Sequence, residues 1–339
     1  MKTKIVMIHG RGQASDERTA SSPELLAAYV LEKKLPFLAG LAKGLVFARR
    51  PPIDESDVIF PFYGNAFNVV IKQFESTGGK VPELESVATA DLDLEGVADD
   101  DTVELSRLQA ELLRDMAEKL QYDAQNELSH SGEESVFPEG VSANDFLKIP
   151  YMTGALQFLS RKTSVSGLII RRHLADVAYY VGRPEMREAV LDVVSTAVLE
   201  NSEPGDDLVV LGHSLGSVVA YDLLAANDDT IRQRNVKLFV TAGCPLGLEV
   251  VKKRVIGRQD GQQPRVPEAV PARPGAWINA YDVLDVVALI HPLAPEFQQR
   301  AERQIVDERT NNPSGPHNIV DYLADPDVAA PISRAMTQS

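Results

Sequence analysis

The chain has 339 residues, of which 44% are hydrophobic and 24% charged, a composition typical of a globular protein and not of a collagen, a coiled coil or a disordered chain. Its 49 acidic residues outnumber 34 basic ones and give a net charge of -15, which argues against nucleic acid or anionic membranes as partners, because both attract clustered cations. The single cysteine, Cys244, excludes an intrachain disulfide and a cysteine-rich zinc site.

Strand and helix patterns alternate along the chain. Short apolar runs predict five β-strands, at residues 4–8, 57–62, 207–212, 237–242 and 276–281. These runs are mostly apolar throughout, as is typical of strands covered on both faces. Helical spacing and helix-start prolines predict helices between them, at residues 23–41, 185–200 and 215–226. The alternation predicts a single α/β domain over residues 1–339, in which helices flank a mostly parallel sheet.

A long helical stretch separates the second predicted strand from the third. Residues 81–106 hold nine acidic side chains and no basic one, which predicts a solvated loop. Residues 103–128 predict an amphipathic helix with an apolar stripe of Leu105, Leu108, Leu112, Met116 and Leu120. We interpret residues 64–182 as a helical insertion over the sheet, a candidate cap or lid. Residues 252–275 predict a surface loop.

The first apolar run, residues 5–8, is too short for the apolar region of a signal peptide. No uninterrupted apolar run approaches the ~18 residues of a membrane-spanning helix. We therefore expect a cytoplasmic protein without an integral membrane segment. The sequence leaves the oligomeric state open.

The clearest chemical motif is Gly212-His213-Ser214-Leu215-Gly216, which joins an apolar strand to an apolar helix. This is G-x-S-x-G in the strand–turn–helix context that holds a nucleophilic serine. Side chains at positions 212 or 216 would collide with the neighbouring strand and helix, so glycines permit the turn. The strained turn aims the Ser214 hydroxyl out of the sheet edge, above the free N–H groups of a helix N-terminus. The motif therefore predicts Ser214 as a nucleophile.

A nucleophilic serine needs a histidine base and an acid that orients the base, and in this motif the chain order is serine, acid, histidine. Of the histidines after Ser214, we favour His317 over His291, because His317 lies in a Gly/Pro-rich loop that can reach back over the sheet edge. The acid should follow the strand at residues 276–281. Two carboxylates stand there, and we favour Asp285, with Asp282 as a loop-ordering residue; the reverse assignment stays open.

The oxyanion of a tetrahedral intermediate needs about two N–H donors. The residue after the nucleophile, Leu215, offers one backbone N–H, and the glycine-rich loop after the first strand offers that of Arg11. The same loop lacks the third glycine of a dinucleotide-binding fingerprint, since Ser15 stands at that position, so we expect no cofactor. We expect no metal site, and we expect Cys244 to be a buried small hydrophobe.

These segments resemble the α/β-hydrolase superfamily, in particular its lipase- and esterase-like bacterial members. The resemblance is carried by IVMIHGRG at 5–12, VVLGHSLGSVVAYDLL at 209–224, FVTAGCPLGL at 239–248, WINAYDVLDVVA at 277–288 and HNIVDYL at 317–323. It implies that Ser214, Asp285 and His317 occupy the triad positions, and that Arg11 and Leu215 occupy the oxyanion-hole positions. It also implies that the inserted helices form a lid. The chain departs from the fuller members of the family, which have eight strands where this sequence predicts five.

We therefore expect a serine hydrolase that cleaves carboxylic esters through an acyl-enzyme intermediate, without cofactor or metal. The aromatic and aliphatic side chains of the insertion favour small-molecule or lipid esters with apolar acyl groups. Three alternatives remain: an acyltransferase or thioesterase with the same triad, a non-catalytic binding protein on this fold, and a protein whose insertion serves mainly as a docking surface.

Overall fold

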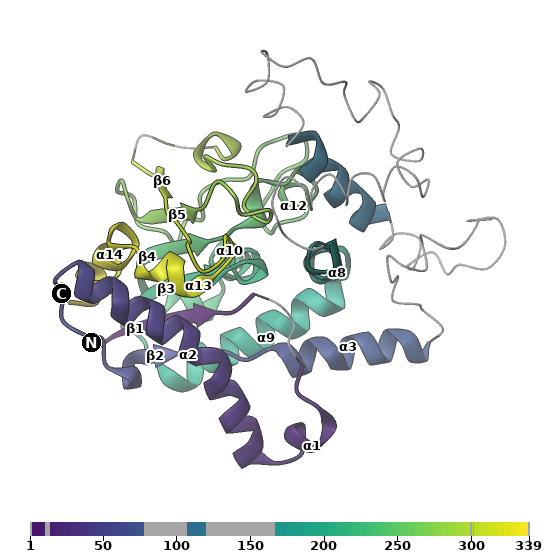
Figure 1. Cartoon of the computed structure of the whole chain (residues 1–339), viewed down its shortest axis with the longest axis horizontal. Coiled ribbons are helices and arrows are strands. Elements are labelled where there is room, and N and C mark those ends of the chain that lie inside the picture. The colour runs from purple at the N-terminus through teal and green to yellow at the C-terminus, as the bar shows by residue number, and fades with distance from the viewer. Residues whose placement is uncertain are drawn as a thin grey trace.

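The computed structural model describes residues 2–10, 14–77, 107–119, 167–298, 300 and 302–337. Six strands form one parallel sheet in the order β2-β1-β3-β4-β5-β6 (Figure 1). Their bounds are β1 Thr3–Ile8, β2 Val58–Ile59, β3 Asp207–His213, β4 Asn235–Ala242, β5 Trp277–Tyr281 and β6 Ile305–Arg309. Helices cover both faces of this sheet, which confirms the predicted α/β class.

The strand predictions need two corrections. The second strand was predicted at residues 57–62, but only Val58 and Ile59 pair with β1, and Pro61 cannot donate to a strand ladder. The sixth strand, β6, was not predicted, because its sequence IVDER lacks a continuous apolar run. It lies at the edge of the sheet, where the burial of a strand is less complete.

One face of the sheet is covered by α2 (Pro23–Phe47), α13 (Ile319–Ala324) and α14 (Pro326–Thr337) (Figure 1). Helix α2 begins where Ser22 caps the Leu25 N–H, and it continues six residues beyond the predicted end at residue 41. The extension contains Gly44, where a Cβ atom would lie 2.2 Å from the Leu323 carbonyl oxygen. A glycine that weakens a helix in isolation thus permits close packing of α2 on α13.

The opposite face is covered by α3 (Gly64–Ser76), α8 (Gly167–Gly182), α9 (Pro184–Asn201) and α10 (Leu215–Ala226) (Figure 1). The observed α9 and α10 match the predicted helices at residues 185–200 and 215–226 to within one residue at each end. The remaining short elements are α1 Glu17–Ala20, η1 Glu55–Asp57, α11 Asp229–Arg232, η2 Pro245–Gly247, α12 Glu249–Lys252 and η3 Ala294–Glu296.

Three parts of the predicted insertion 64–182 are described: residues 64–77, 107–119 and 167–182. Residues 107–119 are helical and bury Leu108, Leu112 and Met116, which confirms the apolar stripe over this part of its length. The predicted acidic loop at residues 81–106, together with Leu105 and Leu120 of the stripe, lies outside the described residues.

The predicted loop at residues 252–275 begins at the last residue of α12 and continues in turns and bends, with one isolated bridge between Arg265 and Gln298. Among the helices of the described ranges, none has the length and apolar character needed to cross a membrane.

Candidate active site

Ser214 lies between β3 and α10 in a strained backbone conformation. Its φ of 56° and ψ of -129° fall in a region that residues other than glycine rarely adopt. The strand ends at His213 and the helix begins at Leu215, so the strand–turn–helix context predicted from the motif is present. The turn presents Ser214 at the carboxyl edge of the sheet.

Three glycines leave the space that this turn requires. A Cβ at Gly212 would lie 2.4 Å from the carbonyl oxygen of Gly216, and a Cβ at Gly216 would lie 2.3 Å from that of Ile8. A Cβ at Gly10 would lie 2.7 Å from Ser214 Cβ and 3.3 Å from its Oγ. Glycines at 212 and 216 therefore let β1, β3 and α10 approach one another, and Gly10 leaves the Ser214 side chain uncovered.

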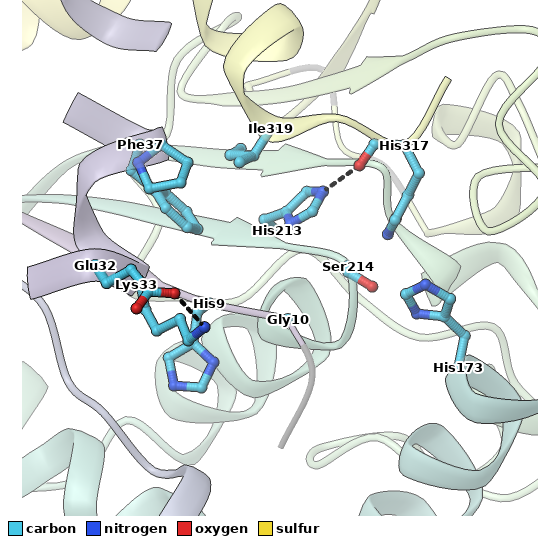
Figure 2. Close-up of a pocket in the computed structure, with 11 residues that line it drawn as sticks. His9, Gly10, Glu32, Lys33, Phe37, His173, His213, Ser214, His317 and Ile319 are labelled. Atoms are coloured by element: carbon cyan, nitrogen blue, oxygen red, sulfur yellow. Dashed lines mark hydrogen bonds and ion pairs between the residues drawn. The ribbon is translucent and has the colours of Figure 1, made fainter. Parts of the chain in front are cut away.

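Ser214 faces a pocket of about 380 Å³ that opens between α2 and α8 (Figure 2). The pocket is lined by His9, Gly10, Glu32, Lys33, Pro36, Phe37, His173, His213, Ser214, His317 and Ile319. Two of the residues predicted for the catalytic machinery, Ser214 and His317, thus meet at one cavity although the chain separates them widely.

His317 is paired with a carboxylate on the side away from the pocket. Its Nδ1 lies 2.7 Å from Oδ2 of Asp285, which is fully buried. The other oxygen of Asp285 accepts the Val287 N–H at 2.9 Å, and Oδ2 also accepts the Tyr322 hydroxyl at 2.6 Å. Burial alone would raise the pKa of Asp285, but His317, Tyr322 and the Val287 N–H together hold that pKa below its usual value. Asp285 is therefore a carboxylate anion that fixes the His317 ring.

Asp282 makes different contacts. Its two carboxylate oxygens accept the backbone N–H groups of Leu284 and Asn312, each at 2.8 Å. Its own N–H donates to the Tyr322 hydroxyl at 3.1 Å. The geometry thus matches the favoured arrangement, in which Asp282 orders the loops and Asp285 contacts the histidine.

The space beside this pair also depends on a glycine. Gly243, which follows β4, has a φ of +58°, and a Cβ there would lie 2.9 Å from both Asp285 Oδ2 and His317 Nδ1. The loop that carries His317 is held by the Asn312 amide, which donates to Pro316 O at 2.7 Å, and by the Ser314 N–H, which donates to Asp321 at 2.7 Å. Several backbone contacts therefore fix where the histidine stands.

The free nitrogen of His317 and the serine hydroxyl point toward each other across the pocket (Figure 2). Both Ser214 Oγ and His317 Nε2 are buried, and neither has a hydrogen-bond partner within the described parts of the chain. Because buried polar atoms normally find partners, two unpaired ones at the base of one cavity are free to bond a substrate or each other.

Three further histidines surround the pair, and chain order alone had set them aside as candidate bases. The His213 Nε2–H donates to the His317 carbonyl oxygen at 3.2 Å, and the two rings lie 4.6 Å apart. Burial, reinforced by the neighbouring His317 and His173 rings, lowers the pKa of His213 well below its usual value, so its ring is neutral at pH 7. His173, from α8, meets the His317 ring edge-on at 4.9 Å.

The third of these histidines, His9, stacks on Tyr63 at 4.1 Å, and the Tyr63 hydroxyl donates to the His9 carbonyl at 2.6 Å. The same hydroxyl also contacts the carbonyl oxygen of Gly10. Tyr63 thus anchors the chain that leads into the predicted oxyanion loop. Arg11 itself lies outside the described residues, whereas Leu215 is the first residue of α10, where backbone N–H groups lack helical partners.

Two other residues considered from the sequence lie away from the pocket lining. His291 stacks on Tyr281 at 4.6 Å and contacts the Ala288 carbonyl oxygen through Nδ1 at 2.9 Å. Cys244 is buried as expected, and burial raises the pKa of its thiol to about 12, so it stays protonated.

No family model, curated protein or solved structure matches this chain.

Proposed function

We propose that this protein is a serine hydrolase that cleaves carboxylic esters, with Ser214 as nucleophile, His317 as general base and Asp285 as the orienting acid. The observation that carries the proposal is the 2.7 Å contact between Asp285 and Nδ1 of His317. The other ring nitrogen of His317, Nε2, has no partner in the described chain and faces the strained Ser214 across the pocket. A nucleophile, a base and a group that orients the base are the three parts that acyl transfer to serine requires.

In the proposed reaction, Ser214 Oγ attacks the carbonyl carbon of the ester while His317 Nε2 accepts the hydroxyl proton. Asp285 keeps the other ring proton on Nδ1 and stabilises the imidazolium that forms. The N–H groups of Leu215 and Arg11 hold the oxyanion of the tetrahedral intermediate. As the intermediate collapses, His317 returns the proton to the departing alcohol, which leaves an acyl group on Ser214.

The second half of the reaction releases the acid. His317 accepts a proton from water, whose oxygen attacks the acyl-enzyme carbonyl. Collapse of the second intermediate returns that proton to Ser214 Oγ and frees the carboxylic acid. Every step uses groups of this chain and water, so the proposal includes no cofactor.

Apolar acyl groups are the proposed substrates, because Pro36, Phe37 and Ile319 give the pocket an apolar wall. A small apolar recess also shares His173 with the pocket. The recess has a volume of about 20 Å³ and is lined by Leu112, Met116, His173, Leu174, Val177, Pro245, Leu248, Val286 and Val287. We also propose a cytoplasmic location, where the one cysteine, already free and buried, would stay reduced.

The proposal is tested by labelling the purified full-length protein with a fluorophosphonate probe and locating the adduct by mass spectrometry. We expect one adduct, on Ser214, and no adduct in Ser214→Ala. Turnover of a p-nitrophenyl ester should fall by about 10⁴–10⁶-fold in that variant, with an unchanged melting temperature. Ser217→Ala is the matched control, because Ser217 Oγ already donates to the Gly212 carbonyl at 2.8 Å. An unlabelled Ser214 in a folded sample would favour a non-catalytic binding protein.

A further inference from the structure

A second cavity lies at the opposite edge of the sheet from Ser214. It has a volume of about 390 Å³, as large as many small-molecule sites, and Ala225 and Ala226 at the end of α10 line one side. Helix α10 has 12 residues and starts beside Ser214, so this end lies about 18 Å farther along the helix. The cavity is therefore separate from the pocket that contains Ser214 and His317.

Four arginines line this cavity: Arg232, Arg265, Arg300 and Arg303. We call it the arginine cavity. Arg232 belongs to α11, just before β4, and Arg303 stands two residues before β6, so these side chains gather where strands begin. Among the described residues of the lining, Glu268 alone is acidic, which leaves three net positive charges there in a chain whose total is -15.

Most of this positive charge has no acidic partner. Arg232 pairs with Asp229 at 2.7 Å, but Arg265, Arg300 and Arg303 make no ion pair with any residue that the structure describes. Arg265 and Arg300 are exposed and Arg303 is partly exposed, so water solvates these charges. An anion in the cavity would meet positive charge that no described carboxylate neutralises.

The guanidinium groups also retain unused hydrogen-bond donors. Arg265 reaches only neutral acceptors, the side-chain amides of Gln298 at 3.3 Å and of Gln259 and Gln262 at 3.4 Å. Arg303 donates one Nη2–H to the Glu268 carbonyl at 3.2 Å, while its Nε is buried and has no partner in the described chain. Each guanidinium carries five N–H donors in a planar fork that fits the oxygens of a phosphate group.

We propose that the arginine cavity binds a small phosphorylated metabolite, with its phosphate oxygens held by Arg265, Arg300 and Arg303. A terminal phosphate has three oxygens and close to two negative charges near neutral pH, and so it can accept charge-assisted hydrogen bonds from several guanidinium groups at once. The cavity volume leaves room for an organic body beside the phosphate. Tyr221 and Val266 supply part of the wall against which that body would pack.

The binding test uses the full-length protein and isothermal titration calorimetry with four probes: inorganic phosphate, pyrophosphate, ribose 5-phosphate and adenosine monophosphate. We expect the organic phosphates to bind more tightly than inorganic phosphate. The double variant Arg300→Ala/Arg303→Ala should bind about tenfold or more weakly, because charge-assisted hydrogen bonds are lost. Equal affinities of the wild type and this variant, or no binding of any probe by the wild type, would overturn the proposal.

Two further variants separate a built site from general attraction between charges. Arg334→Ala removes one exposed arginine on α14, outside the cavity, and should leave the affinity for every probe unchanged. Glu268→Gln removes the one negative charge of the lining and should tighten binding of all four probes, which keeps the proposal testable even where the double variant folds poorly. Weaker binding by Glu268→Gln would contradict the assignment. Fluorophosphonate labelling of Ser214 in each variant reports separately on the proposed hydrolase site.

Discussion

Tyr322 links the two acidic residues that sequence reasoning could not fully separate. Its hydroxyl accepts the Asp282 N–H at 3.1 Å and donates to Asp285 Oδ2 at 2.6 Å. One side chain of α13 therefore sets the position of the loop after β5 and the orientation of the carboxylate that contacts His317. No spacing rule identifies such a residue, because its contacts depend on how α13 lies against the segment that follows β5.

At these two acids, asparagine substitutions should have unequal effects on catalysis. Asp285→Asn replaces a carboxylate oxygen beside His317 Nδ1 by an amide, and we expect kcat to fall by about 10³–10⁴-fold. Asp282→Asn keeps an acceptor for a backbone N–H, and we expect a stability loss of about 1 kcal/mol with kcat little changed. Steady-state kinetics and urea unfolding of both variants measure the two effects. A larger kcat loss from Asp282→Asn would reverse the assignment.

For Tyr322→Phe, we expect kcat to fall about tenfold, equivalent to about 1.4 kcal/mol, with KM unchanged, since Asp285 loses a partner that orients it. The rate of fluorophosphonate labelling should fall by the same factor. The matched control is Tyr221→Phe, which loses the bond from its hydroxyl to the Arg265 carbonyl at 2.7 Å, at the arginine cavity and outside the lining of the Ser214 pocket. Equal losses in both variants would indicate a general loss of stability and not a positioning role.

At the scale of elements, α10 is fastened to its neighbours by a buried polar cluster around Asp222. This side chain lies 3.2 Å from Arg187 of α9, accepts the Tyr180 hydroxyl of α8 at 3.1 Å, and accepts the Ile256 N–H at 2.7 Å. Burial raises the pKa of Asp222 to about 6, against the effect of Arg187. The cluster therefore ties the helix behind Ser214 to α8, whose His173 contacts His317.

Removal of Asp222 should loosen this connection. We expect Asp222→Ala to destabilise the fold by about 3–5 kcal/mol, because it leaves Arg187 largely buried without its partner. Asp229→Ala removes the exposed pair with Arg232 and should cost less than about 1 kcal/mol. Urea unfolding of the two variants compares them directly, and similar losses would mean that the Asp222 cluster contributes no more than a surface ion pair.

The predicted elements differ in how completely local sequence encodes them. The runs at β1 and β3 through β5 were found because burial on both faces leaves continuous apolar stretches. In β6, Asp307 accepts the side-chain amide of Asn279 in β5 at 2.7 Å, and it accepts the Leu293 and Ala294 N–H groups of a neighbouring segment at 2.7 and 2.9 Å. A charged residue with that role hides the strand pattern. The Ser214 turn was found because its serine and both of its glycines fall within five consecutive residues.

At the scale of the whole molecule, stability should depend on pH through buried groups of both kinds. The pKa of His213 in the folded state is well below 6.5. As the pH falls below 6.5, this histidine is protonated in the unfolded chain but stays neutral in the folded one, so the protein loses stability. Asp285, whose pKa is depressed, contributes stability above 3.8 that is lost as the pH falls through its folded-state value. Asp222 and Asp115 have the opposite effect on stability as the pH falls, because burial raises the pKa of each carboxyl to about 6.

A substitution at His213 isolates its share of this dependence. We expect His213→Gln to be less stable than the wild type at about pH 8, and the difference to shrink toward about pH 5, because only the wild type carries the penalty of a histidine that stays neutral. Urea unfolding of both proteins across this range gives the difference directly, since the other groups cancel. A difference that stays constant with pH would show that His213 does not couple folding to protonation.

The long sequence separation between Ser214 and His317 has a consequence during synthesis of the chain. His317 comes 104 residues after His213, and a ribosome that adds about 5–20 residues per second needs about 5–20 s to cover that distance. During this interval the nascent chain already carries Ser214 but lacks its base. In the proposed enzyme, hydrolysis therefore begins only after β4, β5, β6 and the His317 loop have been translated. Until then, Ser214 is not activated by a base.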